Sequence, residues 1–197
     1  MLLNVEMSGK TVLVIGGGKV ASRKVRGLLS TGAEVVVVAP EVLEEIESLA
    51  GAEGLAIRYA GYQESDMEGM FLVVAATDDA VVNRQIATDA ALHGKMVCVA
   101  DAPETGDCSF PALLRRGAIE IGVSTGGGCP SLAVELRDFI ATLISEDHGM
   151  IADRLAKERE KLLTEGNAST YNARALRSLA RRLILEQNTR IVESLNR

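Results

Sequence analysis

Three small residues near the start of the chain have the spacing of a phosphate-binding loop. Gly16, Gly18 and Ala21 form the pattern G-x-G-x-x-A at the end of the β-branched run 11–16. The first glycine permits a tight turn, the second lets the backbone approach a pyrophosphate, and the small third residue lets a helix pack closely on the strand. Free N–H groups at the start of that helix then face the phosphates. The loop predicts a dinucleotide site, and the alternative is a tight turn without a ligand.

A carboxylate stands where a reaction could use it. Asp101 closes the strand-like run 95–101, the fifth such run along the chain. Ligands of open α/β sheets bind beyond the carboxyl ends of the strands, so a carboxylate at this edge can act as a general base. The alternative is a structural role, because Asp-Ala-Pro is a favourable start for a loop.

Polar residues at two other strand ends can contact the same ligand. Thr77 and Asp78 lie at the end of the fourth run, where they would be near a bound dinucleotide, although Asp78 or Asp79 can instead cap the next helix. The second run ends VVAPE, with Glu41 following Pro40 rather than an acid directly at the strand end. Glu41 can reach a ribose or lie in the first turn of a helix. No arginine stands at this strand end to hold a 2′-phosphate, which favours NAD over NADP.

The other polar residues narrow the chemistry. Arg115 and Arg116 could bind the carboxylates of an anionic substrate, or could be solvated surface charges. The chain has no Tyr-x-x-x-Lys pair and no G-x-S-x-G motif, and His93 and His148 show no metal-ligand spacing. Redox chemistry would therefore rest mainly on a bound cofactor.

These residues need a scaffold, and the hydrophobic pattern supplies one. Strand-like runs alternate with helical segments in the first half of the chain; the strands are expected at 11–16, 34–39, 55–60, 70–77 and 95–101. Helices are expected after the glycine loop, at 41–50 and after Asp78. This alternation predicts an α/β fold with a Rossmann-type parallel sheet.

The pattern changes in the second half of the chain. The segment 109–125 predicts two short extended pieces around Gly117, and GGGCP at 126–130 marks a sharp break. A helix with a wide apolar stripe is expected at 131–145, and a hinge at 145–149. Beyond the hinge the chain is charged and helical, from about 150 to 165 and from about 170 onward.

Charge, cysteine content and apolar runs indicate which partners and which location to expect. The net charge of −6 argues against nucleic-acid binding, which needs a basic face. The three cysteines, Cys98, Cys108 and Cys129, form no CxxC pair, which indicates reduced thiols in a cytoplasmic protein. The first residues do not resemble a signal peptide, and no uncharged apolar run approaches the ~20 residues of a membrane span.

Four blocks of sequence together resemble one family. VLVIGGGKVASRKVRGLLSTGAEVVVVAPE, VVAATDDAVVN, VCVADAP and FPALLRRGAIEIGVSTGGGCPSLAVELRDFI occur in the order found in precorrin-2 dehydrogenases, which also form the N-terminal module of siroheme synthases. The match covers about residues 1–147, with TGGG one glycine longer than a common form of that block. The resemblance implies oxidation of precorrin-2 to sirohydrochlorin with NAD⁺, with Asp101 as the general base.

The motifs and the resemblance together assign the site residues, and the resemblance implies the domains. The cofactor is expected to contact Gly16, Gly17, Gly18, Lys19, Val20, Pro40, Glu41, Thr77 and Asp78. The tetrapyrrole substrate is expected to contact Arg115, Arg116, Ser124 and Thr125, and no resident metal site is expected. The implied division is an NAD-binding domain at 1–112, a dimerisation region of a homodimer at 113–147, and a helical domain at 148–197.

Two other functions stay open at this point. Some members of the family also insert Fe²⁺ into sirohydrochlorin, so the protein could be a bifunctional dehydrogenase and ferrochelatase. The glycine loop alone would also fit a non-catalytic module that senses NAD(H), although such modules commonly carry an acid directly at the end of the second strand.

Overall fold

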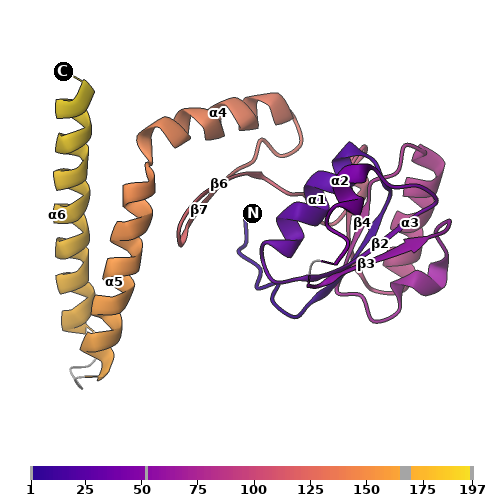
Figure 1. Ribbon diagram of the computed structural model, residues 1–197, viewed down its shortest axis with the longest axis horizontal. Coiled ribbons are helices and arrows are strands. Elements are labelled where there is room, and N and C mark those ends of the chain that lie inside the picture. Colours follow the sequence, from indigo (N-terminus) through magenta and orange to yellow (C-terminus); the bar gives the residue numbers. More distant parts are fainter. Residues whose placement is uncertain (1, 52, 165–169, 196–197) are drawn as a thin grey trace. The chain divides into compact units, whose positions relative to one another are not determined.

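The structure is a computed structural model of the chain, and it describes residues 2–51, 53–164 and 170–195. The chain divides into two compact units, Met1–Phe110 and Pro111–Arg197, and each is described by itself. The chain is coloured along its sequence in Figure 1, with the first unit in indigo to magenta.

The first unit is built on a parallel sheet of five strands. The strands are β1 (Thr11–Ile15), β2 (Glu34–Ala39), β3 (Leu55–Tyr59), β4 (Leu72–Ala75) and β5 (Met96–Val99). Their order across the sheet is β3-β2-β1-β4-β5, and every neighbouring pair is parallel. The predicted α/β fold is therefore confirmed. Ile15 is in register with Val38 on one side and Ala75 on the other, so the ends of these three strands lie within one residue of the same level.

Helices cover both faces of this sheet. On one face α1 (Lys19–Leu29) and the short α2 (Glu44–Glu47) pack on Val12 and Val14 of β1. On the other face α3 (Ala80–Leu92) packs on Leu13 and Ile15, so alternate residues of one strand serve two cores (Figure 1). Two 3₁₀ turns, η1 (Glu64–Met67) and η2 (Pro103–Thr105), lie in the connections.

The helix expected at 41–50 is only one turn long. The chain is still extended at Leu43, whose backbone N–H donates to the Gly17 carbonyl oxygen at 2.9 Å. This bond keeps the segment before Glu44 against the glycine loop, so the helix cannot begin earlier.

The second unit begins with a hairpin and continues as helices. β6 (Ala112–Arg116) and β7 (Ile119–Val123) pair antiparallel around Gly117, as expected. The helices are α4 (Pro130–Leu143), α5 (Glu146–Thr164) and α6 (Thr170–Leu195), and α5 and α6 lie side by side (Figure 1). The division into 1–112, 113–147 and 148–197 stays a prediction.

The hinge expected at 145–149 is instead a packed start of a helix. Ser145 donates its backbone N–H to Nδ1 of the buried His148 at 3.1 Å, which closes the first turn of α5. A methyl group at Gly149 would lie 2.7 Å from the Arg116 carbonyl oxygen, so the backbone of α5 touches the hairpin turn directly. Within the described residues, none of the helices is both long enough and apolar enough to cross a membrane.

Candidate functional site

The first glycine of the loop is held between two strands. Gly16 has a φ of 124°, which side chains rarely allow, and its N–H donates to the Val38 carbonyl oxygen at 3.0 Å. A Cβ at this position would lie 2.3 Å from the Ala76 carbonyl oxygen. Glycine is therefore required here by the dihedral angle and also by the packing, because the nearest atoms belong to the backbone of Ala76 and Thr77 and cannot turn away as a side chain could.

The next two glycines have different surroundings. A Cβ on Gly17 would lie 1.9 Å from the Glu41 carbonyl oxygen and 2.7 Å from the Val42 Cα, so the backbone just after Pro40 is packed against the loop. A Cβ on Gly18 would meet nothing within 4 Å. The space beside Gly18 is open, as required where a ligand's phosphates approach the backbone.

The start of α1 suits an anion. Gly18 is the N-cap residue and provides no side-chain cap, and the first turn of α1 holds no acidic residue. Lys19 and Val20 are exposed at this helix start, whereas Ala21 is fully buried in the core below it. The small residue at the third position of the motif therefore does what the pattern predicts: it lets α1 pack closely on the sheet.

The end of β4 contributes Thr77, and the two aspartates after it have different roles. Asp79 caps α3, accepting hydrogen bonds from the backbone N–H of Val81 at 2.7 Å and of Val82 at 3.3 Å. Asp78 is exposed and leaves the capping to its neighbour. A Cβ on Gly16 would lie 3.0 Å from the Thr77 nitrogen, so Thr77 adjoins the glycine loop.

Asn83, which the sequence analysis did not single out, joins the ends of β4 and β5. Its side chain is 1% exposed, and its Nδ2 donates to Asp101 Oδ1 at 2.8 Å. The same amide contacts Thr77 through both its oxygen and its nitrogen. Asp101 itself is exposed, at the carboxyl edge where it was expected. A signal was available: asparagine is a poor residue for a buried helix interior unless it has partners.

Lys24 of α1 is half-buried. Lys24 Nζ is 4.0 Å from the centre of the Phe110 ring, and burial lowers the pKa of Lys24. Burial raises the pKa of the Cys98 thiol, and raises the pKa of Cys108 to about 11. Both cysteines are therefore neutral thiols at physiological pH rather than nucleophiles.

The predicted substrate residues lie in the second unit and make contacts within it. Arg115 Nε lies 2.7 Å from Glu120 Oε1 across the hairpin, and Arg116 Nε donates to the Ile144 carbonyl oxygen at 3.1 Å. The hydroxyl oxygens of Ser124 and Thr125 accept backbone N–H groups in the turn before α4. Their role in substrate binding stays a prediction.

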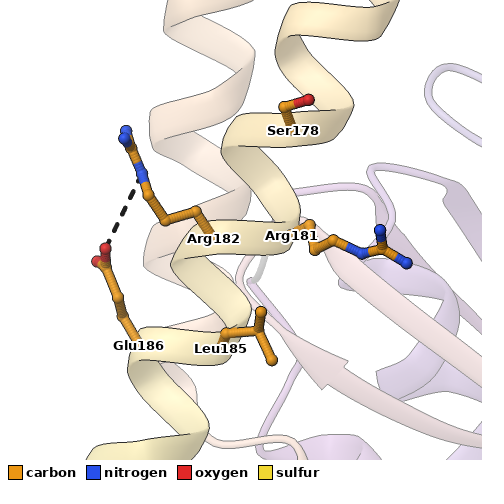
Figure 2. A pocket seen from close by; sticks show the side chains of 5 residues that line it. All are labelled: Ser178, Arg181, Arg182, Leu185 and Glu186. Carbon is orange, nitrogen blue, oxygen red and sulfur yellow. Dashed lines mark ion pairs between the residues drawn. The ribbon is translucent and has the colours of Figure 1, made fainter.

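A shallow pocket in the second unit contains none of the predicted site residues. It has a volume of about 410 Å³ and is lined only by residues of α6, with Arg182 Nε 3.9 Å from Glu186 Oε1 (Figure 2). Over the part of the chain that the structure describes, no cluster of three or more histidine, cysteine or acidic side chains could hold a metal ion.

The sheet order and the glycine loop at the carboxyl end of β1 define a Rossmann-type dinucleotide-binding domain. A family model described as "Putative NAD(P)-binding" matches residues 3–112, and the chain belongs to this family. The predicted nicotinamide dinucleotide cofactor agrees with that family.

Curated relatives agree with the resemblance seen in the sequence. The chain is 43% identical over 157 residues to a siroheme synthase of Ectopseudomonas mendocina (strain ymp), covering 80% of this chain and 34% of the relative. It is 41% identical over 150 residues to a siroheme synthase of Methylococcus capsulatus (strain ATCC 33009 / NCIMB 11132 / Bath), covering 76% of this chain and 32% of the relative. The chain thus spans about a third of the length of these relatives.

A solved structure matches almost the whole chain. This is SirC, precorrin-2 dehydrogenase, with a TM-score of 0.76 and 26% sequence identity, covering 96% of this chain and 99% of that one. These matches confirm the predicted relationship to precorrin-2 dehydrogenases and the N-terminal part of siroheme synthases.

Proposed function

We propose that this protein oxidises precorrin-2 to sirohydrochlorin, with NAD⁺ as the hydride acceptor, on the route to sirohaem. The observation that carries the proposal is the likeness to SirC, which extends over both chains nearly end to end. The match covers only about a third of the siroheme synthases, so the activities of their remaining parts are not included in the proposal.

The cofactor's place is at the glycine loop. The backbone N–H groups at the start of α1 bind the pyrophosphate, and the open side of Gly18 admits it. Glu41, which follows Pro40 directly, lies against Gly17, where a ribose would be bound, and no arginine follows β2 to favour a 2′-phosphate. The residues assigned to this site are Gly16, Gly17, Gly18, Lys19, Val20, Pro40, Glu41, Thr77 and Asp78.

Asp101 is the general base of the proposed reaction. Oxidation of the substrate removes one hydride and one proton, and bound NAD⁺ supplies the hydride acceptor. The proton passes to Asp101, whose carboxylate is exposed at the carboxyl edge of the sheet. Asn83 holds Oδ1 of this carboxylate in the folded protein.

The second unit provides the substrate contacts and the dimer interface of the proposal. Arg115, Arg116, Ser124 and Thr125 bind the carboxylates of the tetrapyrrole, for which arginine is suited. The helix α4 exposes a set of large apolar side chains, which supports a homodimer; these are Leu132, Val134, Leu136, Phe139 and Leu143. The cytoplasmic location expected from the cysteines stays a prediction.

The test is a spectrum of precorrin-2 with NAD⁺, recorded with and without the purified full-length chain. The proposal expects sirohydrochlorin and NADH to appear together in equal amounts, much faster than without protein. NADP⁺ in place of NAD⁺ should give a lower kcat/KM. Binding of NAD⁺ without oxidation of the tetrapyrrole would contradict the proposal and favour the sensing module.

A further inference from the structure

The buried amide of Asn83 has a fixed orientation. Its oxygen accepts from the Thr77 backbone N–H at 3.2 Å and lies 2.7 Å from Thr77 Oγ1, and its nitrogen donates to the Thr77 carbonyl oxygen at 3.1 Å. A backbone N–H can only donate and a carbonyl can only accept, so a flipped amide would face two like groups. Only one orientation of the amide therefore satisfies the backbone of Thr77.

This orientation determines what Asp101 meets. With the amide oxygen used by Thr77, the group that faces Asp101 has to be the N–H donor, and Nδ2 lies 2.8 Å from Oδ1. Among the residues that the structure describes, the hydrogen bond to this carboxylate runs to Oδ1, which leaves Oδ2 to receive a proton.

The backbone alone does not hold the Asp101 side chain in place. The residue lies beyond the last residue of β5, Val99, in an irregular segment before the 3₁₀ turn η2, and it is exposed. Asn83, in contrast, is 1% exposed and belongs to α3, whose start is capped by Asp79. An exposed carboxylate in an irregular segment is thus bonded to a buried side chain of α3 by one hydrogen bond.

We propose that Asn83 is a positioning residue: its amide orients the Asp101 carboxylate so that the second carboxylate oxygen faces the substrate. This inference rests on the proposed function, in which Asp101 is the base. The competing explanation is that Asn83 only satisfies buried backbone groups of Thr77 and contributes stability alone. The two explanations differ in what a loss of the donor does to kcat.

The test replaces the donor and keeps the acceptor. Asn83→Asp has nearly the same shape and still accepts from Thr77, but it presents a carboxylate oxygen to Asp101. We expect kcat to fall on the order of 10- to 100-fold, as for a misplaced catalytic group, while the KM for precorrin-2 and the Kd for NAD⁺ change less than about threefold. In an Asp101→Asn background the same substitution should leave kcat unchanged, because the residue it acts through is already lost.

Asp89→Asn is the matched control. Asp89 is also buried on α3, where it accepts from Tyr62 at 2.8 Å and from Gln85 at 2.7 Å, but it lies near the other end of the helix. This variant should lose thermal stability without a loss of kcat. An Asn83→Asp variant that behaves the same way, losing stability alone, would overturn the inference.

A second variant covers the case in which Asn83→Asp does not fold. Asp101→Glu changes an exposed position and keeps an acid, but moves the carboxylate by one methylene away from its hydrogen bond with Asn83. The inference expects a similar fall in kcat, and full activity would overturn it. If the wild-type chain does not oxidise precorrin-2, or if Asp101→Asn is fully active, the proposed function or its base is wrong. If Asn83→Asp has the wild-type kcat and Asp101→Asn is inactive, the positioning role of Asn83 is wrong and the proposed function stands.

Discussion

The carbonyl oxygen of Glu41 lies against Gly17, so closely that a Cβ on the glycine would fall 1.9 Å from it. The same contact region contains the hydrogen bond from the Leu43 N–H to the Gly17 carbonyl oxygen at 2.9 Å. The glycine loop and the segment after β2 are therefore packed backbone to backbone, and the contact requires that residue 17 has no side chain.

Gly17→Ala and Gly18→Ala should separate stability from cofactor binding. We expect Gly17→Ala to lower the melting temperature, because its Cβ would collide with backbone atoms of Glu41 and Val42 that cannot move aside. Gly18→Ala should keep the wild-type melting temperature but raise the Kd for NAD⁺ at least tenfold, since its Cβ enters the space where the pyrophosphate approaches. Thermal melts and calorimetric titration with NAD⁺ measure both quantities.

Gly27→Ala provides the control for this pair. Gly27 lies within α1, where a Cβ would meet nothing within 4 Å, so alanine should stabilise the helix by about 0.5–1 kcal/mol and leave the Kd for NAD⁺ unchanged. If Gly18→Ala also binds NAD⁺ with the wild-type Kd, the pyrophosphate does not lie beside Gly18.

Asp101→Ala should slow turnover strongly and retain NAD⁺ binding. The side chain is exposed, so water can replace it at the Asn83 amide, and the fold should survive. General-base assistance is worth about 10²–10⁴-fold, and we expect kcat to fall within that range. Appearance of NADH in the presence of precorrin-2 gives kcat, and a titration with NAD⁺ gives the Kd. Turnover at the wild-type rate would remove Asp101 from the mechanism.

The raised pKa of Cys108 should make stability fall at alkaline pH. The folded thiol holds its proton up to a pKa of about 11, whereas the unfolded thiol loses it near pH 9. Between these values the folded state binds more protons than the unfolded state, so the free energy of unfolding decreases as pH rises through that window. Melts from pH 8 to 11 should show a smaller decrease for Cys108→Ala than for the wild type. Equal decreases would show that Cys108 ionises equally in both states.

Phe139→Glu should dissociate the proposed homodimer. Phe139 is 62% exposed on α4, among the other apolar side chains of that helix, and a carboxylate there would have to be buried in the interface without a partner. Sedimentation of the variant should give the mass of a monomer at concentrations where the wild type is a dimer. Glu135→Gln, an exposed change on the same helix, should leave the dimer intact. A wild-type chain that sediments as a monomer at all concentrations contradicts the dimer.

The sheet was predictable because its signals are local. The continuous aliphatic runs of β1, β2 and β4 are typical of strands buried on both faces, and the spacing of Gly16, Gly18 and Ala21 depends only on the turn that follows β1. The predicted bounds of these elements are therefore close to those in the structure. The alternation of strands and helices predicted a parallel sheet, but it did not determine the order of the strands, since doubly wound sheets have more than one order.

The contacts between elements were not predictable in this way. The helix expected at 41–50 is shortened by a hydrogen bond from Leu43 to Gly17, which depends on how two loops meet. The bond from Asn83 to Asp101 depends on the rotation of α3 about its axis and on the position of β5. The hinge expected at 145–149 is a helix start because His148 and Gly149 pack within their own unit. Side-chain periodicity carries no information on such distances.

The contact between Gly149 and the hairpin turn sets a limit on how the chain can be shortened. A methyl group at Gly117 would lie 3.3 Å from the Gly149 Cα, so two backbones meet here with no side chain between them. A protein engineered to end within the first turn of α5 would leave the carbonyl of Arg116 and the turn at Gly117 facing water. A truncated protein that keeps the sheet domain and the hairpin should therefore retain Gly149. In a series of C-terminal truncations, solubility should fall once Gly149 is removed.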